Sequence, residues 1–289
     1  MGVGSLLVAT LLTSWGEGVT SENCWRDYPR PQMVRTSWTN LNGDWDYAVT
    51  SVTNTSGRPT TWQGKIRVPY PIESTLSGVG KNLEPDQFLW YTRKIQVKKS
   101  GEGEGRGGER ILLHFGGVDF RTMVFIGHKE VTDVPHEGGQ NPFTLDITDF
   151  VVDGENELTV CVWDPTEDFV NSRGKQSFDP HVCFYTRVSG IWQTVWMETV
   201  PADYISGYKV FTDIDRGEVK IEVEKRGGGG QRKKFTVVAK GLSKENKYVK
   251  AVTLNGKPLK GFGIRHADIL AGGELVFEMT DRPLAIWNK

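Results

Sequence analysis

The residues best suited to chemistry are polar and aromatic side chains gathered in one stretch, residues 164–185. Asparagine, glutamine and arginine carry planar groups that can make paired hydrogen bonds to neighbouring hydroxyls, and an aromatic ring can stack on an apolar C–H face. Both kinds of contact suit a pyranose. The candidates for sugar contact are Asn171, Arg173, Lys175, Gln176 and Tyr185. A solvated loop explains the same composition equally well, so both interpretations stay open.

Other chemistries lack the sequence context that they need. The glycine motif at residues 103–108 fits G-x-G-x-x-G, but a strand pattern at residues 111–115 follows it. Nucleotide binding would need a helix there, because the helix N-terminus receives the phosphates. The sequence also contains no Gly-x-Ser-x-Gly and no His-Glu-x-x-His. We therefore expect no nucleotide and no cofactor.

Histidines and cysteines give no metal site. The chain contains His114, His128, His136, His181, His266, Cys24, Cys161 and Cys183. Their spacing fits neither a zinc site nor a Cys-x-x-Cys motif, so we expect no metal. His114 lies within an apolar stretch and is expected to be a hydrogen-bonded core residue. For Cys161 and Cys183 two interpretations stay open, namely two buried small side chains or a disulfide between them.

The charge composition argues against nucleic acid and acidic membrane surfaces as partners. The chain has 289 residues, 37% of them hydrophobic, and its 35 Lys and Arg against 36 Asp and Glu give a net charge of -1. This balance offers no electrostatic case for nucleic acid or for an acidic membrane surface, whereas a neutral sugar fits it. No stretch approaches the ~18 apolar residues that a membrane span requires. Length alone allows about two domains.

The N-terminal segment, residues 1–21, resembles a signal peptide. Residues 5–12 form its apolar core, and residues 19–21 offer small side chains for cleavage, although no basic residue precedes the core. We therefore expect a secreted or extracytoplasmic protein. In a protein secreted by a eukaryote, Asn54 would be a glycosylation acceptor.

Short strands are predicted along most of the chain. Alternating or apolar strand patterns begin at Trp45 and cover residues 66–68, 90–97, 111–115, 121–127, 142–148, 158–163, 191–198, 205–211, 218–223 and 274–279. Turn residues separate them, as at 154–156 and 215–217, and no helical period runs for ten residues or more. This pattern is typical of an antiparallel sandwich, so the expected fold class is all-β. Residues 191–198 alternate strictly, which predicts one continuous strand after the turn Ser189-Gly190.

Several motifs occur together in a known order. They are Pro29-Arg30-Pro31, Leu41-Asn42-Gly43 before Trp45, Leu89-Trp90-Tyr91-Thr92-Arg93, Phe115-Gly116-Gly117-Val118-Asp119 and Ser189-Gly190-Ile191-Trp192. With them, residues ~25–224 resemble the N-terminal sugar-binding domain of glycoside hydrolase family 2, the β-galactosidase, β-mannosidase and β-glucuronidase group. The resemblance implies a jelly-roll, galactose-binding-like sandwich over residues 25–200. It also implies the first hairpin of an immunoglobulin-like sandwich from residue 204.

The tail has a different resemblance. Residues 231–289, after a four-glycine linker at 227–230, resemble the C-terminal end of glycoside hydrolase family 92, the calcium-dependent exo-α-mannosidases. The resemblance is carried by Asn255-Gly256, His266-Ala267-Asp268, the strand pattern at 274–279, Pro283 and Trp287. Asn255-Gly256 is a hairpin turn by type, and His266-Ala267-Asp268 is expected to be a turn or a cap. We expect residues 204–289 to form one smaller, partial sandwich-like or immunoglobulin-like β domain.

The resemblances bring no catalytic residues with them. Family 2 enzymes carry two catalytic glutamates on a barrel of ~250 residues, for which the sequence after Val200 has no room. In β-galactosidases an acidic residue five positions before Ser-Gly-Ile reaches the galactose, and this chain has Phe184 there. Arg187 is expected to be structural, paired with a carboxylate such as Asp119 or Glu198. The glycines of His136-Glu137-Gly138-Gly139 are expected to shape the backbone.

We therefore expect a non-catalytic, carbohydrate-binding part of a β-galactosidase-like family 2 glycoside hydrolase, whose partner is a β-linked glycoside. Two alternatives stay open, namely a structural module that docks on a separate catalytic glycosidase chain and a truncated gene product. A docking module would expose an apolar patch. An active glycosidase, hydrolysing O-glycosyl bonds, would need a carboxylate pair ~5–10 Å apart, for which the sequence offers no motif.

Overall fold

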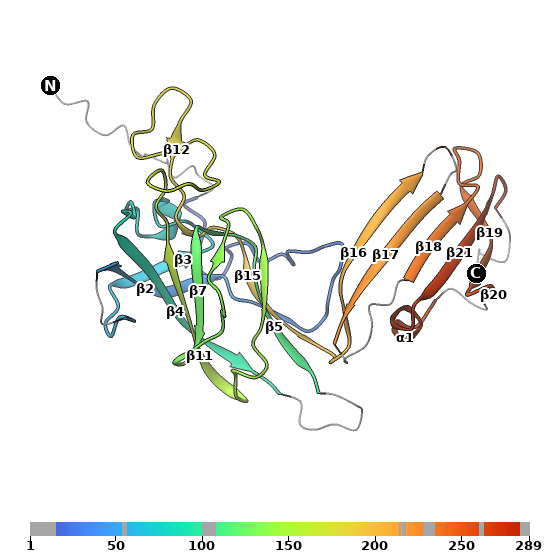
Figure 1. Cartoon of the computed structure of the whole chain (residues 1–289), viewed down its shortest axis with the longest axis horizontal. Helices are drawn as coiled ribbons and strands as arrows, with labels where there is room; N and C mark the ends of the chain where they lie inside the picture. The colour runs from blue at the N-terminus through green and yellow to red at the C-terminus, as the bar shows by residue number, and fades with distance from the viewer. Residues whose placement is uncertain are drawn as a thin grey trace. The chain divides into compact units, whose positions relative to one another are not determined.

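The computed structural model of the chain describes residues 16–53, 57–99, 108–213, 215, 218–227, 235–259 and 263–283. The apolar core of the N-terminal segment, Asn54, most of both glycine-rich stretches and Trp287 lie outside these residues. The described part is built from strands β1 to β21, with one five-residue α-helix and one 3-10 turn (Figure 1). The all-β prediction is thus confirmed. Residues 16–99 and 109–199 belong to one compact unit, and residues from Val200 onward to a second.

Two sheets make up most of the first unit. The larger has the order β3 (Gly64–Val68), β2 (Gly43–Ser51), β4 (Gln87–Val97), β11 (Gly154–Trp163), β7 (Arg121–Ile126) and β8 (Lys129–Glu130), with β9 (His136–Glu137) also paired to β7. The smaller has the order β1 (Trp38–Asn40), β15 (Val195–Val200), β5 (Arg110–Phe115) and β10 (Phe143–Asp146). Short pairs add β6 (Val118–Asp119) with β14 (Gly190–Ile191), and β12 (Gln176–Ser177) with β13 (Tyr185–Thr186). The 3-10 turn η1 covers Thr75–Ser77.

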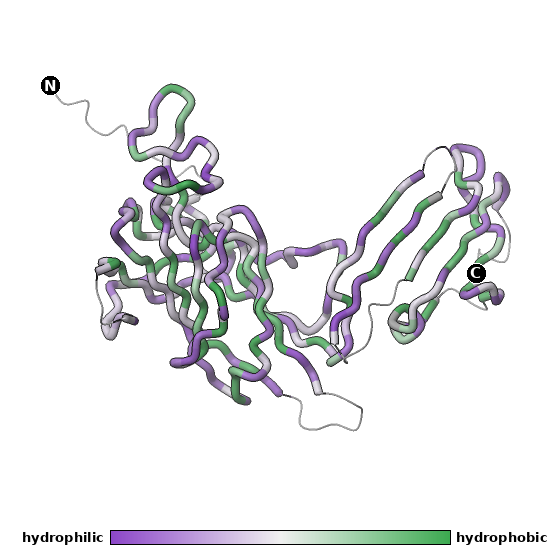
Figure 2. Tube along the Cα trace, viewed as in Figure 1, coloured by the Kyte–Doolittle hydropathy of each residue, from purple (hydrophilic) through white to green (hydrophobic). Residues whose placement is uncertain are grey.

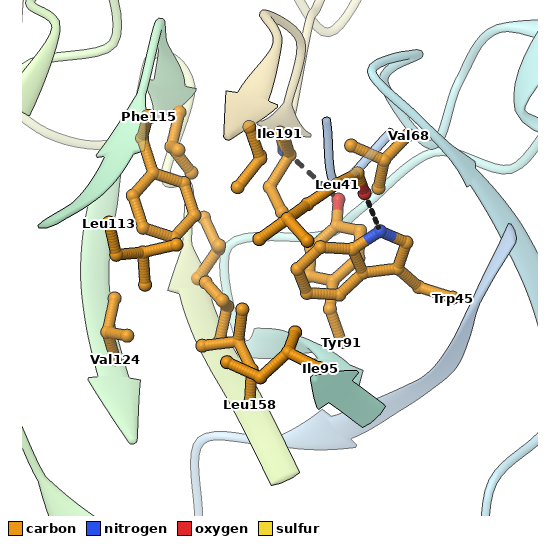
Figure 3. Close-up of a cluster of buried hydrophobic side chains, with 14 of the residues drawn as sticks. Leu41, Trp45, Val68, Tyr91, Ile95, Leu113, Phe115, Val124, Leu158 and Ile191 are labelled. Carbon is orange, nitrogen blue, oxygen red and sulfur yellow. Dashed lines mark hydrogen bonds between the residues drawn. The ribbon is translucent and has the colours of Figure 1, made fainter. Parts of the chain in front are cut away.

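One apolar core lies between these sheets. It takes Trp45 and Tyr91 from the larger sheet and Phe115 from the smaller, all fully buried (Figure 3). Two hydrogen bonds run through it. The indole Nε1 of Trp45 donates to the carbonyl of Leu41 at 2.8 Å, and the backbone N–H of Ile191 donates to the Tyr91 hydroxyl at 3.1 Å. The indole of Trp45 and the hydroxyl of Tyr91 are therefore both paired where they enter this core.

The strand predicted at residues 191–198 is interrupted, so that prediction is wrong in part. β14 ends at Ile191 and β15 begins at Val195, because the N–H groups of Trp192 and Gln193 both donate to the carbonyl of Gly117. Strict alternation also fails inside β15, where residues 195–198 are all buried. The outward face of this strand is covered by the segment of residues 28–35, from which Tyr28 and Arg30 contact Glu198. The periodicity of the strand alone does not reveal this cover.

Glu198 is the residue through which that segment is attached. Its side chain is fully buried and accepts hydrogen bonds from the Tyr28 hydroxyl and from Arg30 Nη2 at 2.7 Å and Arg35 Nε at 3.1 Å. Nε2 of His114 lies 3.2 Å from the same carboxylate, and Nδ1 of His114 bonds to Thr144. His114 is thus the hydrogen-bonded core residue that the sequence predicted.

The pKa of Glu198 reflects these contacts. Burial alone would raise the pKa of Glu198, but the contacts with His114, Tyr28 and Arg30 outweigh the effect of burial and lower the pKa to about 2.

Two smaller expectations are wrong. Cys161 is buried, but Cys183 is exposed and all three cysteines are free thiols, so neither the disulfide nor the paired burial of Cys161 and Cys183 holds. Residues 154–156 were expected to turn, yet β11 begins at Gly154 and pairs with β4 from there. Gly154 adopts φ +94°, a conformation that glycine allows inside the paired strand.

The second unit is a set of paired strands with one short helix. β16 (Tyr204–Asp213) and β17 (Glu218–Arg226) form a hairpin, and a further sheet has the order β18 (Phe235–Lys240), β21 (Gly273–Thr280), β19 (Tyr248–Leu254) and β20 (Lys257–Pro258). Figure 2 shows the alternating hydropathy of β17, and its Val223 packs on the core around Phe235, Val252 and Leu275. Asn255-Gly256 makes the expected turn, with φ +51° and +75°. In α1 (His266–Leu270), Asp268 accepts from the N–H of Arg265, which is the expected cap.

Within the described residues, no helix has the length and apolar character needed to cross a bilayer.

Replacing Tyr91 by phenylalanine tests the hydrogen bond inside the core. In Tyr91→Phe the buried N–H of Ile191 loses its acceptor, so we expect the free energy of unfolding to fall by about 1–3 kcal/mol. Urea denaturation measures it. Tyr47→Phe is the matched control, because it removes a hydroxyl from the same core without removing a hydrogen bond between described residues, and it should change stability by less than about 0.5 kcal/mol. Equal effects of the two substitutions would contradict a role for the bond.

The second substitution concerns Glu198. Because its pKa in the folded protein, about 2, lies below the ordinary 4.5, its contribution is present above pH 4.5 and is lost as the pH falls toward 2. Glu198→Gln should therefore lower the free energy of unfolding by about 3 kcal/mol at pH 7 and flatten its fall in acid. Denaturation at pH 3, 4 and 7 measures both effects. Glu137→Gln, which removes only an exposed partner of Arg121, should leave the pH dependence unchanged.

Candidate functional site

A long loop, residues 164–189, connects β11 to β14 and contains all five predicted sugar-contact residues. Its only regular structure is the short parallel pair of β12 and β13, and in Figure 1 it stands clear of the sheets around the label β12. Large apolar side chains are exposed along it, namely Phe169, Val170, Val182, Phe184 and Tyr185. Exposed apolar groups gathered on one loop make it a candidate interaction surface.

Gln176 lies at the base of the loop and is engaged inside the protein. Its side chain is buried, Nε2 donates to Oδ2 of Asp119 at 3.0 Å, and Oε1 accepts from the N–H of Val188 at 2.6 Å. The amide thus joins the middle of the loop to its end and to β6. Gln176 therefore positions the loop, whereas the sequence grouped it with the residues predicted to contact a sugar.

Tyr185 and Lys175 lie at the surface. The Tyr185 ring is 49% exposed, and its hydroxyl accepts from the backbone N–H of Lys175 at 3.2 Å. Gly174 lets this ring approach, since its φ is +64° and a Cβ there would lie 2.6 Å from the Tyr185 hydroxyl. The loop therefore holds the half-exposed Tyr185 side chain by its hydroxyl, and Lys175 itself is exposed.

Asn171 and Arg173 retain unused hydrogen-bonding capacity. Among the described residues, three buried atoms have no hydrogen-bond partner: the two amide atoms of Asn171 and the Nε of Arg173. Nη2 of Arg173 comes only within 4.0 Å of Glu167. Buried polar atoms without partners are costly in a folded protein, and other described side chains share this state, among them Oε1 of Glu73 and Nε1 of Trp196. What sets Asn171 and Arg173 apart is their place on the loop that also exposes aromatic rings.

Three buried carboxyl groups fasten the loop to the sandwich, and sequence reasoning missed them. Glu73 accepts from the N–H of Ser189 at 2.9 Å, Asp164 accepts from the Ser189 hydroxyl at 2.6 Å, and Asp119 accepts from Gln176. Each of the three carboxyl residues is less than a tenth exposed. They come from separate parts of the chain, so no spacing in the sequence marks them.

These carboxyl groups bind protons more tightly than usual. Burial raises the pKa of Glu73 to about 7, against the bond from Ser189 that opposes the shift. Burial, and then the charge of Asp164, raise the pKa of Asp119 to about 7, and burial raises the pKa of Asp164 as well. No group of three or more His, Cys, Asp or Glu side chains in the described ranges is arranged to hold a metal ion.

Arg187 is structural, as predicted, but its partner is neither Asp119 nor Glu198. The side chain is 5% exposed, Nη1 donates to the carbonyl of Leu83 at 2.9 Å, and Nη2 pairs with Glu84 at 3.1 Å. Its guanidinium also lies over the ring of Phe178, 4.8 Å from the centroid. Arg187 thus ties the end of the loop to residues 83–84, because this segment passes closer to it than the two expected carboxylates do.

The glycines before β10 have the expected backbone role. Gly138 adopts φ +131°, and a Cβ on Gly139 would lie 2.3 Å from the carboxyl group of Asp119. Gly139 therefore makes room for the side chain that holds Gln176, and its carbonyl accepts from the indole of Trp192 at 2.7 Å.

Comparison with known proteins identifies the class of the first unit as a sugar-binding domain of glycoside hydrolases. The family model described as "Glycosyl hydrolases family 2, sugar binding domain" matches residues 28–201, more than half of the chain. The chain therefore belongs to glycosyl hydrolase family 2 through this domain. A second family model, "Glycosyl hydrolase family 92 catalytic domain", matches residues 216–281. Both resemblances drawn from the sequence are confirmed.

Individual relatives match only over part of their length. A β-galactosidase of Thermoanaerobacter pseudethanolicus is 24% identical over 174 residues, which are 59% of this chain and 22% of that protein. A β-glucuronidase of Felis catus is 24% identical over 77% of this chain and 37% of its own length. The chain thus spans between about a fifth and two fifths of these curated relatives.

Solved structures show the same fold. A β-glucuronidase of an uncultured Clostridium superposes with a TM-score of 0.54 and 21% identity, covering 74% of this chain and 41% of that one. A β-glucuronidase of Faecalibacterium prausnitzii gives a TM-score of 0.51 and 20% identity, with 70% and 37% covered. At these identities the likeness concerns the fold.

Gln176→Leu tests whether this amide positions the loop. The substitution leaves the N–H of Val188 and the carboxyl of Asp119 without their partner, so the free energy of unfolding should fall by about 1–3 kcal/mol and cleavage of the loop by a protease should become faster. Lys175→Ala, at the exposed neighbouring position, should change neither quantity. If both variants are cleaved at the wild-type rate, Gln176 does not hold the loop.

Proposed function

We propose that the first unit binds carbohydrate through the loop at residues 164–189 and does so without catalysing hydrolysis. The observation that carries this proposal is the pair of side chains with unused hydrogen-bonding atoms, Asn171 and Arg173, on the loop that also exposes the rings of Phe184 and Tyr185. Membership of the family 2 sugar-binding domain supports carbohydrate as the ligand class.

Each part of this loop matches a need of a sugar. Ring hydroxyls are recognised by planar amide and guanidinium groups, which donate or accept two hydrogen bonds at once. The C–H face of a pyranose stacks on an aromatic ring that is held in a fixed orientation, as the bond from Lys175 to Tyr185 provides. We assign Asn171 and Arg173 to hydroxyl contacts, Tyr185 to stacking and Lys175 to the rim.

The assignment of binding without hydrolysis is supported by the state of the nearby carboxyl groups. Hydrolysis uses two carboxyl groups that both reach the glycosidic bond. Glu73, Asp119 and Asp164 are instead closed off from solvent and hydrogen-bonded to Ser189 or Gln176. Their arrangement suits anchorage of the loop. We propose a β-linked glycoside as ligand, as the names of the family relatives suggest.

A second candidate function is docking of the loop on a catalytic glycosidase chain. It is favoured by Val170 and Val182, which are 95% and 99% exposed, since a pyranose contact does not need aliphatic side chains. On this alternative the loop inserts into an apolar hollow of the other chain. The two functions differ in the residues that determine binding. Asn171 and Arg173 would determine the binding of a sugar, whereas Val170 and Val182 would determine the binding of a catalytic chain.

Calorimetric titration separates these functions. We expect the chain to bind a galactoside, mannoside or glucuronide of β configuration, and Asn171→Ala and Arg173→Ala each to weaken binding about tenfold or more, since each removes at least one hydrogen bond. Gln96→Ala, an exposed amide on β4, is the control and should bind as the wild type does. Aryl glycosides should release no product above buffer.

Three results would count against the proposal. An absence of heat with every sugar would exclude carbohydrate binding, and wild-type affinity in both loop variants would exclude this site. Turnover of an aryl glycoside would exclude the non-catalytic assignment. Capture of a family 2 catalytic chain that depends on Val170 and Val182, without any sugar affinity, would establish the docking function instead.

A further inference from the structure

We propose that Glu73, Asp119 and Asp164 form a proton-dependent latch, which holds the loop at residues 164–189 closed when these carboxyl groups are protonated and loosens it when they ionise. The latch deepens the proposed function, because it rests on that function for its consequence: carbohydrate binding tightens as the pH falls below neutral. The loosening itself is a property of the loop and is independent of any ligand.

The latch acts on both ends of the loop. Asp164 is its first residue and Ser189 its last, and the Ser189 hydroxyl donates to Asp164 at 2.6 Å, which closes the loop on itself. The N–H of Ser189 donates to Glu73 at 2.9 Å, so the closed base is fixed to the segment before η1. The middle of the loop is fixed by Gln176, which donates to Asp119 on β6.

Charges around the cluster favour its protonated form. Glu73 faces Asp164, Ser189 and the hydroxyl of Tyr91, and none of these groups is a cation. Oε1 of Glu73 is buried and has no hydrogen-bond partner among the described residues. Burying this carboxyl group as a neutral acid costs less free energy than burying it ionised, because the ionised form leaves an uncompensated charge in the interior.

The other two carboxyl groups face a similar setting. Asp119 faces Asp164, the Gln176 amide and the backbone of Gly139, none of which is a cation. Asp164 faces Ser189, Thr166 and a cation, Arg187. Arg187 is already paired with Glu84, so it compensates at most part of three negative charges.

The direction of the effect follows from the proton affinities. In the closed loop the pKa values of Glu73 and Asp119 are both about 7, above the ordinary 4.5 and 3.8 that exposure in an open loop would restore. A raised pKa in the closed state stabilises that state at low pH, and the advantage is lost as the pH rises to about 7. Opening exposes the polar atoms of the loop, so a closed loop and a formed sugar site go together.

Hydrogen exchange of the unliganded chain tests the latch directly. We expect the protection factors of the Gln176, Val188 and Ser189 amides to fall at least about tenfold between pH 5 and pH 7.5, after correction for intrinsic exchange. In Glu73→Gln with Asp119→Asn, which imitate the neutral acids, protection should stay within about twofold over this range. Asp46→Asn, at an exposed carboxylate paired with Lys65, is the control and should behave as the wild type.

The outcomes are separable. Constant protection in the wild type, or an unchanged pH dependence in the double variant, would overturn the latch. The wild-type measurement needs no substitution, so poor folding of a variant leaves the proposal falsifiable. Titration with a β-glycoside at the same two pH values then tests the consequence for binding. A higher affinity at pH 5 than at pH 7.5 in the wild type, but not in the double variant, supports the link between the latch and sugar binding. An absence of sugar binding defeats the proposed function, while exchange still decides the latch.

Discussion

The path of the chain in the first unit depends on how polar backbone groups are paired where they enter the apolar core between its two sheets. Where the chain crosses from one sheet to the other, at Gly190-Ile191, the N–H of Ile191 would be buried without a partner if Tyr91 did not present its hydroxyl there. Gly190 is required at the same point, because it has φ +86° and a Cβ would lie 2.0 Å from that hydroxyl. One hydrogen bond and one missing side chain thus fix the crossing.

The course of the loop at residues 164–189 is a consequence of this crossing. Because Ile191 is held by Tyr91, the preceding Ser189 is brought against Glu73 and Asp164, and the loop must close at that place. The loop has little apolar core of its own, so its order depends on buried polar contacts at its base. Buried polar contacts stabilise a structure only when every donor and acceptor is paired. The order of the loop is therefore more sensitive than the order of the sheets to the protonation of these carboxyl groups.

The sequence predicted what local alternation and turn chemistry determine. Strands β2, β4, β5 and β7, the hairpin of β16 and β17 and the turn at Asn255-Gly256 were all foreseen. What failed depends on contacts between distant residues. The break at residues 192–194 follows from Gly117, and the burial of Glu198 from Tyr28 and Arg30. Periodicity describes one element at a time, so it carries no information about what covers that element.

The candidate site shows the same limit in its chemistry. Residue type alone grouped Gln176 with Asn171 and Arg173, since all three carry the planar groups that suit a sugar. The structure separates them by what their atoms already do: Gln176 satisfies Asp119 and Val188, whereas the amide of Asn171 and the Nε of Arg173 are buried with no partner among the described residues. A polar group whose bonds are made inside the protein shapes a site, and one whose bonds are unmade has free energy left to gain from a ligand. In this loop, residues of the same chemical kind therefore differ in what their atoms do: Gln176 anchors the loop, whereas Asn171 and Arg173 are the residues that we assign to a ligand.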